Sequence, residues 1–257
     1  MKLLRRIVIA LLIVCFGGIV SVLWFFNAFY RADSEAEAAM KSDSRAAVID
    51  TDYGWLFDGP SEECAMIFYG GAAVDERAYA PLLHEIAAKG MDVCLLRCPM
   101  KCSMCAPNRA KLPLANHQYR IWVIGGHSLG GVTASRFVKE HRETFSGILF
   151  LGSYPYYEIP SEVRKLSVIA SNDGVIDTEK LAYYNGKYLT DNSTVVTIEG
   201  GNHGQFGYYG KQFLDNDATI SHAQQTEETV SAVEEYLIKP LNSLPVNAES
   251  AADKQKQ

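Results

Sequence analysis

The stretch Gly126-His127-Ser128-Leu129-Gly130-Gly131 has the pattern G-x-S-x-G with one further glycine. An apolar run rich in β-branched residues, 121–124, precedes it, and residues 132–141 can form a helix. Between a strand and a helix, this pattern is typical of a nucleophile elbow, a strained turn that projects a serine hydroxyl from the top of a sheet. Side chains at positions 126 and 130 would collide with the neighbouring strand and helix, which explains both glycines.

Two later segments place an acid and then a base after predicted strands. Residues 166–170 form a short apolar strand that leads into a polar turn with Asp173, and strand 193–198 leads into a glycine-rich loop with His203. Because the carboxyl ends of parallel strands share one edge of a sheet, Ser128, Asp173 and His203 should converge there. His203 would take the proton of Ser128, and Asp173 would fix the imidazole tautomer.

Asp177 competes with Asp173 for the role of the acid. It lies further along the chain, at the start of a predicted helix, where an N-cap explains it. We favour Asp173 because it follows its strand directly. Asp75 precedes the elbow in the chain, so we expect it to cap a helix instead.

Two backbone N–H groups are expected to bind the oxyanion of the reaction. The N–H of Leu129, at the start of the helix after the elbow, can point at a developing negative charge. The second donor should come from the loop after strand 65–69, where two glycines precede Ala72. Gly71 or Ala72 would supply it, because the glycine pair lets the backbone approach a substrate closely.

In this order, the motifs resemble those of alpha/beta hydrolase family 5, a group of compact hydrolases near the dienelactone-hydrolase-like proteins. The resemblance covers about residues 64–238 and implies an α/β-hydrolase fold and serine hydrolase activity, with the same three triad residues. The chain departs from the family after strand 91–97, where the family continues with apolar residues and this chain has three cysteines. The matching stretches are Tyr69–Asp75, Ala78–Leu82, Gly125–Gly131, Ser171–Gly174 and Glu199–Gly207.

The chain contains six cysteines, which could form disulfides or bind a metal ion. Cys98, Cys102 and Cys105 follow a predicted strand, and outside the cytoplasm we expect at least one disulfide among them or to Cys64. The alternative is a zinc site on the three thiolates, with Cys64 or His117 as a fourth ligand. Which cysteines pair cannot be read from the sequence. The other two, Cys15 and Cys94, lie in the apolar N-terminal run and in a predicted core strand.

The N-terminus predicts a membrane anchor. Lys2, Arg5 and Arg6 precede an uncharged run from Ile7 to Tyr30. As a helix, these roughly 24 residues would extend about 36 Å, enough to cross a bilayer with some tilt. A cleaved signal peptide has an apolar region of only about 7–15 residues, so we interpret the run as an uncleaved signal anchor. Positive charges before the span place the N-terminus in the cytoplasm and the catalytic domain outside. A cleaved signal or a buried core helix are the alternatives.

Composition and periodicity indicate how the remaining strands, helices and domains of the chain are organised. Strands alternate with helices at 75–89, 131–141, 178–185 and 224–238, which predicts a mostly parallel sheet with helices on both faces. The net charge of −6 argues against a nucleic-acid partner, and no nucleotide-binding glycine pattern follows a strand. The expected divisions are a cytoplasmic tip and anchor at 1–31, a stalk leading into the domain at 32–60, the α/β-hydrolase domain at 61–240 and a disordered tail at 241–257.

These observations predict a membrane-anchored, extracytoplasmic serine hydrolase that cleaves an ester or other acyl bond of a small molecule. Such a reaction needs no metal and no organic cofactor. An acyltransferase on the same triad is one alternative, and a catalytically idle hydrolase fold that binds a cell-envelope ligand is another. The sequence leaves the substrate and the oligomeric state open.

Overall fold

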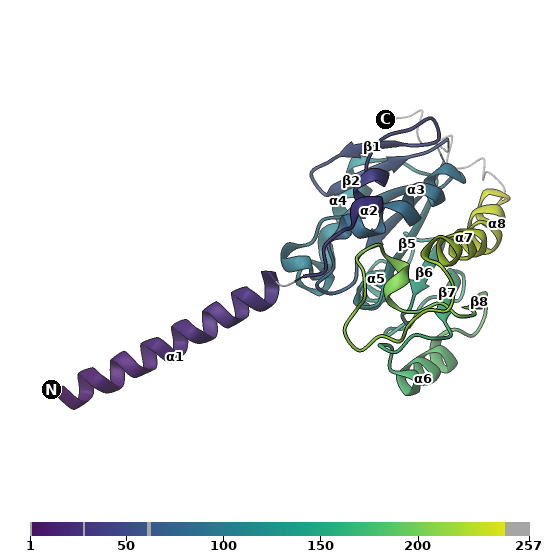
Figure 1. Cartoon of the computed structure of the whole chain (residues 1–257). Helices are drawn as coiled ribbons and strands as arrows, with labels where there is room; N and C mark the ends of the chain where they lie inside the picture. Colours follow the sequence, from purple (N-terminus) through teal and green to yellow (C-terminus); the bar gives the residue numbers. More distant parts are fainter. Residues whose placement is uncertain (1, 28, 61–62, 245–257) are drawn as a thin grey trace.

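The computed structural model describes residues 2–27, 29–60 and 63–244 (Figure 1). Most of the predicted disordered tail, from 245 onward, lies outside these residues. Eight strands form one sheet in the order β1-β2-β4-β3-β5-β6-β7-β8. The pairs β1–β2 and β2–β4 are antiparallel, and the other five pairs are parallel. The strands are β1 (Ala47–Asp50), β2 (Gly54–Asp58), β3 (Cys64–Tyr69), β4 (Asp92–Leu96), β5 (Ile121–His127), β6 (Gly147–Leu151), β7 (Arg164–Ala170) and β8 (Ser193–Ile198).

Helices flank this sheet on both faces, as predicted. The α-helices are α1 (Lys2–Asn27), α2 (Ser34–Ala39), α3 (Ala80–Ala88), α4 (Lys111–Asn116), α5 (Leu129–Glu140), α6 (Thr178–Tyr188), α7 (His222–Val233) and α8 (Lys239–Asn242). Short helical turns are η1 (Glu76–Tyr79), η2 (Pro99–Lys101), η3 (Ser103–Cys105), η4 (Pro107–Ala110), η5 (Gly204–Phe206) and the π-type η6 (Glu234–Ile238).

The central strand β3 explains why both faces are covered. All six of its side chains are buried, because successive residues point to opposite faces and each face meets helices. Met66 and Phe68 pack in the cluster that includes residues of α3 and α7. Ala65 and Ile67 pack in the other cluster, with residues of α5. The parallel register of β3, β5 and β7 then brings their carboxyl ends to one edge of the sheet.

Much of residues 32–60, the expected stalk and entry to the domain, forms regular structure. Residues 34–39 form α2, whose N-cap Asp33 accepts hydrogen bonds from the N–H groups of Glu35 and Ala36. Residues 47–50 and 54–58 form β1 and β2 and extend the sheet beyond β4. The short strand β1 is only half-buried or exposed, so its sequence lacks the apolar alternation by which a strand is identified.

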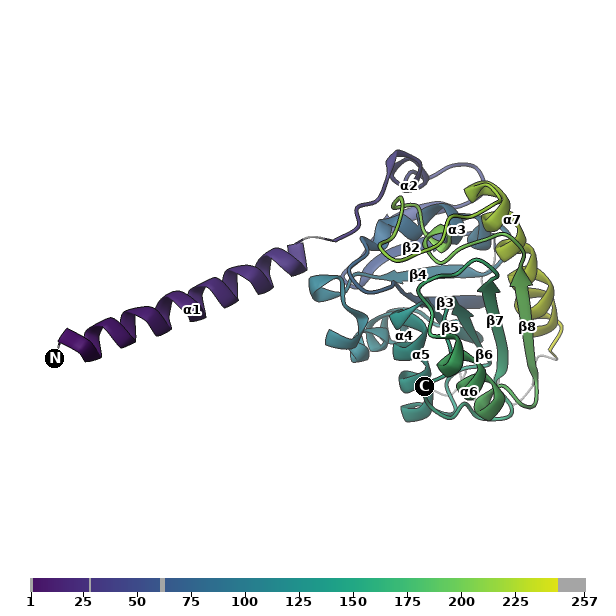
Figure 2. The same cartoon turned by 60° about the horizontal axis from the view of Figure 1, so that its bottom comes forward.

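The N-terminal helix α1 projects from the domain (Figures 1 and 2). Its stretch Leu4–Val22 is long and apolar enough to cross a membrane, and none of that stretch is buried inside the protein. A core helix of a soluble domain would be mostly buried, so the alternative of a buried helix does not hold. This observation rests on the length and composition of α1, and a signal sequence would have the same length and composition.

Candidate active site

Ser128 occupies the sharp turn between β5 and α5. Its backbone has φ 52° and ψ −121°, a conformation that is strained for any residue with a side chain. The neighbouring glycines make the turn possible, because a Cβ on Gly126 would lie 2.4 Å from the carbonyl carbon of Gly130. A Cβ on Gly130 would lie 2.2 Å from the carbonyl oxygen of Tyr69. The glycine requirement inferred from the sequence therefore has a direct steric basis.

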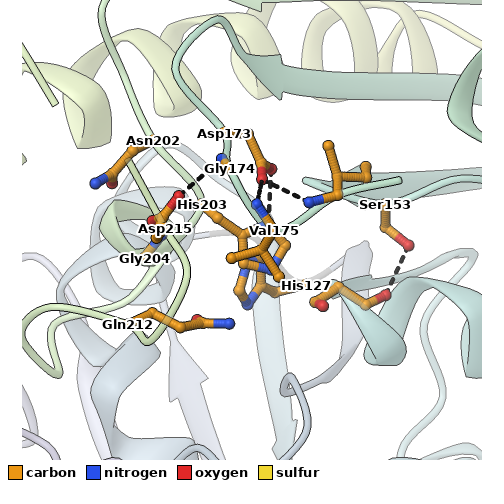
Figure 3. Close-up of polar contacts among 12 residues, drawn as sticks. His127, Ser153, Asp173, Gly174, Val175, Asn202, His203, Gly204, Gln212 and Asp215 are labelled. Carbon is orange, nitrogen blue, oxygen red and sulfur yellow. Dashed lines mark hydrogen bonds and ion pairs between the residues drawn. The ribbon is translucent and has the colours of Figure 1, made fainter. Parts of the chain in front are cut away.

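Two further hydrogen bonds hold the elbow. The Ser128 N–H donates to the carbonyl of Leu151 at 2.9 Å, at the end of the adjacent strand β6. The Ser153 hydroxyl donates to the carbonyl of Ser128 at 2.7 Å (Figure 3). The strained turn is thus tied to β6 and to the segment that follows it.

Asp173 and His203 form a buried pair at the same edge of the sheet. Asp173 Oδ2 lies 2.6 Å from His203 Nδ1, and both side chains are almost fully buried (Figure 3). The other carboxylate oxygen accepts the N–H groups of Val175 and Ile176, at 2.9 and 2.8 Å. All of these donors orient the carboxylate, so Nδ1 of His203 carries its proton toward Asp173 and Nε2 is left as the basic nitrogen.

The competing acid, Asp177, makes other contacts. Asp177 is the N-cap of α6 and accepts the N–H of Lys180 at 3.0 Å, as the sequence predicts. Asp75 likewise caps η1 by accepting the N–H of Arg77. Of the two candidate acids, Asp173 is the one that contacts His203.

A cavity of about 210 Å³ opens between the elbow and the histidine. Ser128 and His203 both line it, and Leu129 and Val132 of α5 form one wall. His203 Nε2 is buried and has no hydrogen-bond partner among the described residues. The remaining lining residues come from the segments after β6 and β7: Gly152, Ser153, Tyr154, Val175, Ile176 and Asp177. His203 therefore borders the space where a substrate would meet Ser128, with Nε2 not occupied by another described residue.

The two candidate oxyanion donors after β3 differ. The Gly71 N–H donates to the hydroxyl of Tyr79 at 2.9 Å, so it is not available to a substrate in this structure. Ala72 is exposed, and its N–H makes no hydrogen bond within the described part of the chain. Of the two positions left open by the sequence, Ala72 is therefore the better candidate, together with Leu129 at the first turn of α5.

Tyr79 also fixes the state of His127. Its hydroxyl lies 2.8 Å from His127 Nδ1, and since it accepts the Gly71 N–H, its own proton is directed to Nδ1. Burial, with the adjacent His203, holds the pKa of His127 well below its ordinary value. The two imidazole rings lie 4.4 Å apart, so a neutral His127 adds no positive charge next to the proposed base.

The profile of an alpha/beta hydrolase family matches residues 65–227. The chain belongs to this family. Together with the elbow, the membership assigns it to the serine hydrolases of the carboxylesterase type. A comparison with curated proteins gives no match.

Solved structures share the fold of this hydrolase at low sequence identity. Est1E from Butyrivibrio proteoclasticus is 16% identical, with 78% of this chain and 100% of that chain covered and a TM-score of 0.54. A ferulic acid esterase from Streptomyces cinnamoneus is 19% identical, with 74% and 73% covered and a TM-score of 0.54. A monoacylglycerol lipase from Paleococcus ferrophilus is 11% identical, with 70% and 97% covered and a TM-score of 0.53. These likenesses concern the fold alone.

The loop after β4, which carries Cys98, Cys102 and Cys105, differs from the prediction of a disulfide. No disulfide joins the described cysteines. Cys64 begins β3, whereas Cys98 follows the carboxyl end of the parallel strand β4, so about 20 Å of strand separates them. That is far beyond the Cα separation of a disulfide, about 4.4–6.8 Å. Burial raises the pKa of the Cys98 thiol to about 12.

Cys102 and Cys105 are close neighbours in this loop. A hydrogen bond between their side chains raises the pKa of Cys105. Among the residues that the structure describes, no group of three His, Cys, Asp or Glu side chains gathers to hold a metal ion. Neither His117 nor Cys64 therefore completes a site with the loop, and His117 instead lies 2.9 Å from the Tyr53 hydroxyl.

Asp215 is a residue of the site that sequence reasoning missed. Its buried carboxylate accepts the Gly204 N–H at 2.7 Å and the Gly174 N–H at 3.0 Å (Figure 3). These glycines follow His203 and Asp173 directly, so one side chain joins the two loops that carry the acid and the base. Asp215 lies in an irregular segment without a motif, and the sequence offers no signal that distinguishes it from the nearby Asp217.

Proposed function

We propose that this α/β hydrolase is a membrane-anchored serine hydrolase that cleaves an ester or another acyl bond through an acyl-Ser128 intermediate. The observation that carries the proposal is that one cavity is bordered by Ser128 on its strained turn and by His203, which is bonded to Asp173. A serine at such a turn beside an oriented imidazole has the arrangement needed for nucleophilic catalysis.

In the proposed reaction, the Ser128 hydroxyl turns toward His203 and gives its proton to Nε2. The oxygen attacks the carbonyl carbon, and the N–H groups of Leu129 and Ala72 bind the oxyanion that forms. His203 returns the proton to the departing alcohol, which leaves the acyl group on Ser128. Water then repeats the sequence, and the carboxylic acid is released. Asp173 holds the imidazole and stabilises its cationic form throughout.

The cavity supports an acyl substrate. Leu129, Val132, Val175 and Ile176 line it with apolar surface, which suits the apolar part of an acyl substrate. The names of structural neighbours such as a ferulic acid esterase and a monoacylglycerol lipase describe ester hydrolysis, which agrees with this choice.

The anchor and its orientation form the second part of the proposal. Lys2, Arg5 and Arg6 precede the apolar stretch of α1, so the N-terminus would stay in the cytoplasm. The hydrolase domain, which follows α1, would then lie outside the cytoplasm.

Kinetics on p-nitrophenyl esters of increasing acyl length test the reaction. Full-length protein in detergent should hydrolyse esters of this series, and the rates along it should define the acyl length that the site accepts. Ser128→Ala should remove nearly all turnover, and Asp173→Asn should reduce kcat by at least about a hundredfold because the imidazole loses its orientation. Asp177→Asn is the matched control, and it should change kcat less than about threefold. Full activity in Asp173→Asn, with loss of activity in Asp177→Asn, would show that the acid is misassigned.

A further inference from the structure

The segment that follows the apolar helix, residues 29–33, is bound to the catalytic edge of the sheet. The Tyr30 N–H donates to the carbonyl of Ala73 at 2.7 Å, and the Asp75 N–H donates to the carbonyl of Tyr30 at 2.8 Å. Ala73 follows Ala72, the candidate oxyanion donor. The chain leaving α1 therefore pairs with the loop that borders the proposed site.

Two more loops of the same edge contact this segment. The Phe213 N–H donates to the Tyr30 hydroxyl at 2.9 Å, and the Asp33 N–H donates to the carbonyl of Tyr208 at 3.0 Å. The ammonium of Lys101, in the loop after β4, lies over the ring of Phe29 at 5.4 Å. Both views show α1 leaving the domain beside the loop after β4 (Figures 1 and 2).

The length of the connection limits how far this edge can lie from a bilayer. Helix α1 ends at Asn27, and Tyr30 is already hydrogen-bonded to the domain. Three residues extend at most about 11 Å, so the catalytic edge stays next to the end of the helix whatever the tilt of α1. When α1 is embedded, the loops around Ser128 are held against the lipid surface.

Large apolar side chains protrude from two of these loops. Phe213 is 77% exposed and Leu214 is 73% exposed, more than any other described large apolar residue outside α1. Met100 and Met104, in the loop after β4, are also exposed. We call these four residues the apolar rim. Exposed apolar groups on loops beside the end of a membrane-spanning helix are typical of a membrane interaction site.

The backbone holds the tip of the rim in a fixed position. Leu214 has φ +68°, a conformation that a leucine adopts only at a cost, and its side chain gains no burial in return. The next residue, Asp215, is locked to Gly174 and Gly204. A Cβ on Gly174 would lie 2.8 Å from the carbonyl oxygen of Leu214, so the tip packs directly on the segment that continues into the cavity wall at Val175.

We propose that the apolar rim inserts into the interfacial layer of the membrane that holds α1, and that the substrate is a membrane-borne amphiphilic ester. This inference rests on the proposed function and adds to it the substrate class and the direction from which the substrate arrives. An ester whose apolar part lies in the bilayer reaches Ser128 across the rim, without crossing the aqueous phase.

Photocrosslinking tests the placement of the rim without relying on activity. The full chain is reconstituted in phospholipid nanodiscs with p-benzoylphenylalanine in place of Phe213. A second sample carries the same group in place of Val195, an exposed position on the edge strand β8. Irradiation should attach phospholipid at position 213 at least about fivefold more often than at position 195. Equal yields, or attachment to protein only, would overturn the proposal.

A kinetic comparison tests the substrate class. The double variant Phe213→Ser, Leu214→Asn makes the tip polar, and asparagine tolerates the backbone conformation at 214. In nanodiscs it should hydrolyse a long-chain 4-methylumbelliferyl ester dissolved in the bilayer at least about fivefold more slowly than the unaltered protein. Its rate on soluble 4-nitrophenyl acetate should stay within twofold, because neither residue contacts the cavity.

The outcomes of the two experiments are separable. Equal rates of the unaltered and double-variant proteins on the bilayer ester would contradict the route across the rim, and an unaltered protein that hydrolyses only the soluble ester would contradict the substrate class. An unaltered protein that hydrolyses neither ester would contradict the proposed function, whereas the crosslinking yield would still decide where the rim lies.

Discussion

At the scale of single residues, the site depends on side chains that orient its backbone as much as on those that would react. Asp215 is the clearest case, because it accepts N–H groups from the acid loop and from the histidine loop. Hydrogen bonds to a charged group contribute about 1.5–3 kcal/mol each. Asp215→Ala should therefore lower the free energy of unfolding by about 3 kcal/mol and reduce kcat/KM more than about tenfold.

Asp217 provides the control for this prediction. It has the same side chain and lies in the same segment, but it is exposed and paired with Lys211 at the surface. Asp217→Ala should change stability by no more than about 0.5 kcal/mol. Urea unfolding and steady-state kinetics of both variants give the comparison. Similar effects of the two substitutions would show that Asp215 has no positioning role.

Some residues of the site can be predicted from the sequence and others cannot. Ser128, Asp173 and His203 each follow a strand that is identifiable by its composition, and chain order relates them to one another. Two other features depend on contacts between residues far apart in the chain. They are the hydrogen bonds that Asp215 accepts from Gly174 and Gly204, and the hydrogen bond that the Gly71 N–H donates to the Tyr79 hydroxyl. No local pattern encodes such contacts, so the sequence alone does not distinguish Gly71 from Ala72.

At the scale of elements, the apolar runs of the parallel strands can be predicted from the sequence, whereas the short or polar elements cannot. The strand β5 and the helix α5 lie where the pattern around the elbow predicts them. The antiparallel pair β1–β2 lies in the segment expected to be a stalk. Strands of only four or five residues carry little periodicity, and β1 is in addition half-buried or exposed. Tertiary pairing, of β1 with β2 and of β2 with β4, defines these two strands rather than local propensity.

The first residue of β4 gives a pH-dependent prediction. Burial, opposed by hydrogen bonds from Tyr119 and Gly59, raises the pKa of Asp92 from 3.8 to about 6. The folded protein thus binds this proton more tightly than the unfolded chain does. The stability that protonation contributes is fully present below about pH 4, and it is lost as the pH rises through about 6.

The variant Asp92→Asn should remove this dependence. An amide keeps an acceptor for the Gly59 N–H but cannot ionise in the core. Two pKa units correspond to about 3 kcal/mol, so the variant should gain up to that amount relative to the unaltered protein between pH 4 and pH 8. Thermal unfolding of both proteins in detergent across this range measures the difference. A difference that does not vary with pH would contradict the prediction.

At the scale of the whole molecule, the proposal places a hydrolase domain on the outer surface of a membrane with its catalytic edge toward the lipid. Full-length protein should remain in the membrane fraction after carbonate extraction, because α1 is embedded. Protease added to intact spheroplasts should digest the domain. Protection of the domain from protease would reverse the orientation, and recovery in the soluble fraction would remove the anchor.

The central claim is that Ser128 is the nucleophile of an active serine hydrolase. A fluorophosphonate probe tests it most directly, since the probe phosphonylates only a serine that an adjacent base activates. The full chain should gain the mass of one adduct, and peptide mass spectrometry should locate it on Ser128. The variant Ser128→Ala, in protein whose thermal unfolding is unchanged, should gain none. An unlabelled full chain, or an adduct on another residue that persists in Ser128→Ala, would contradict the account.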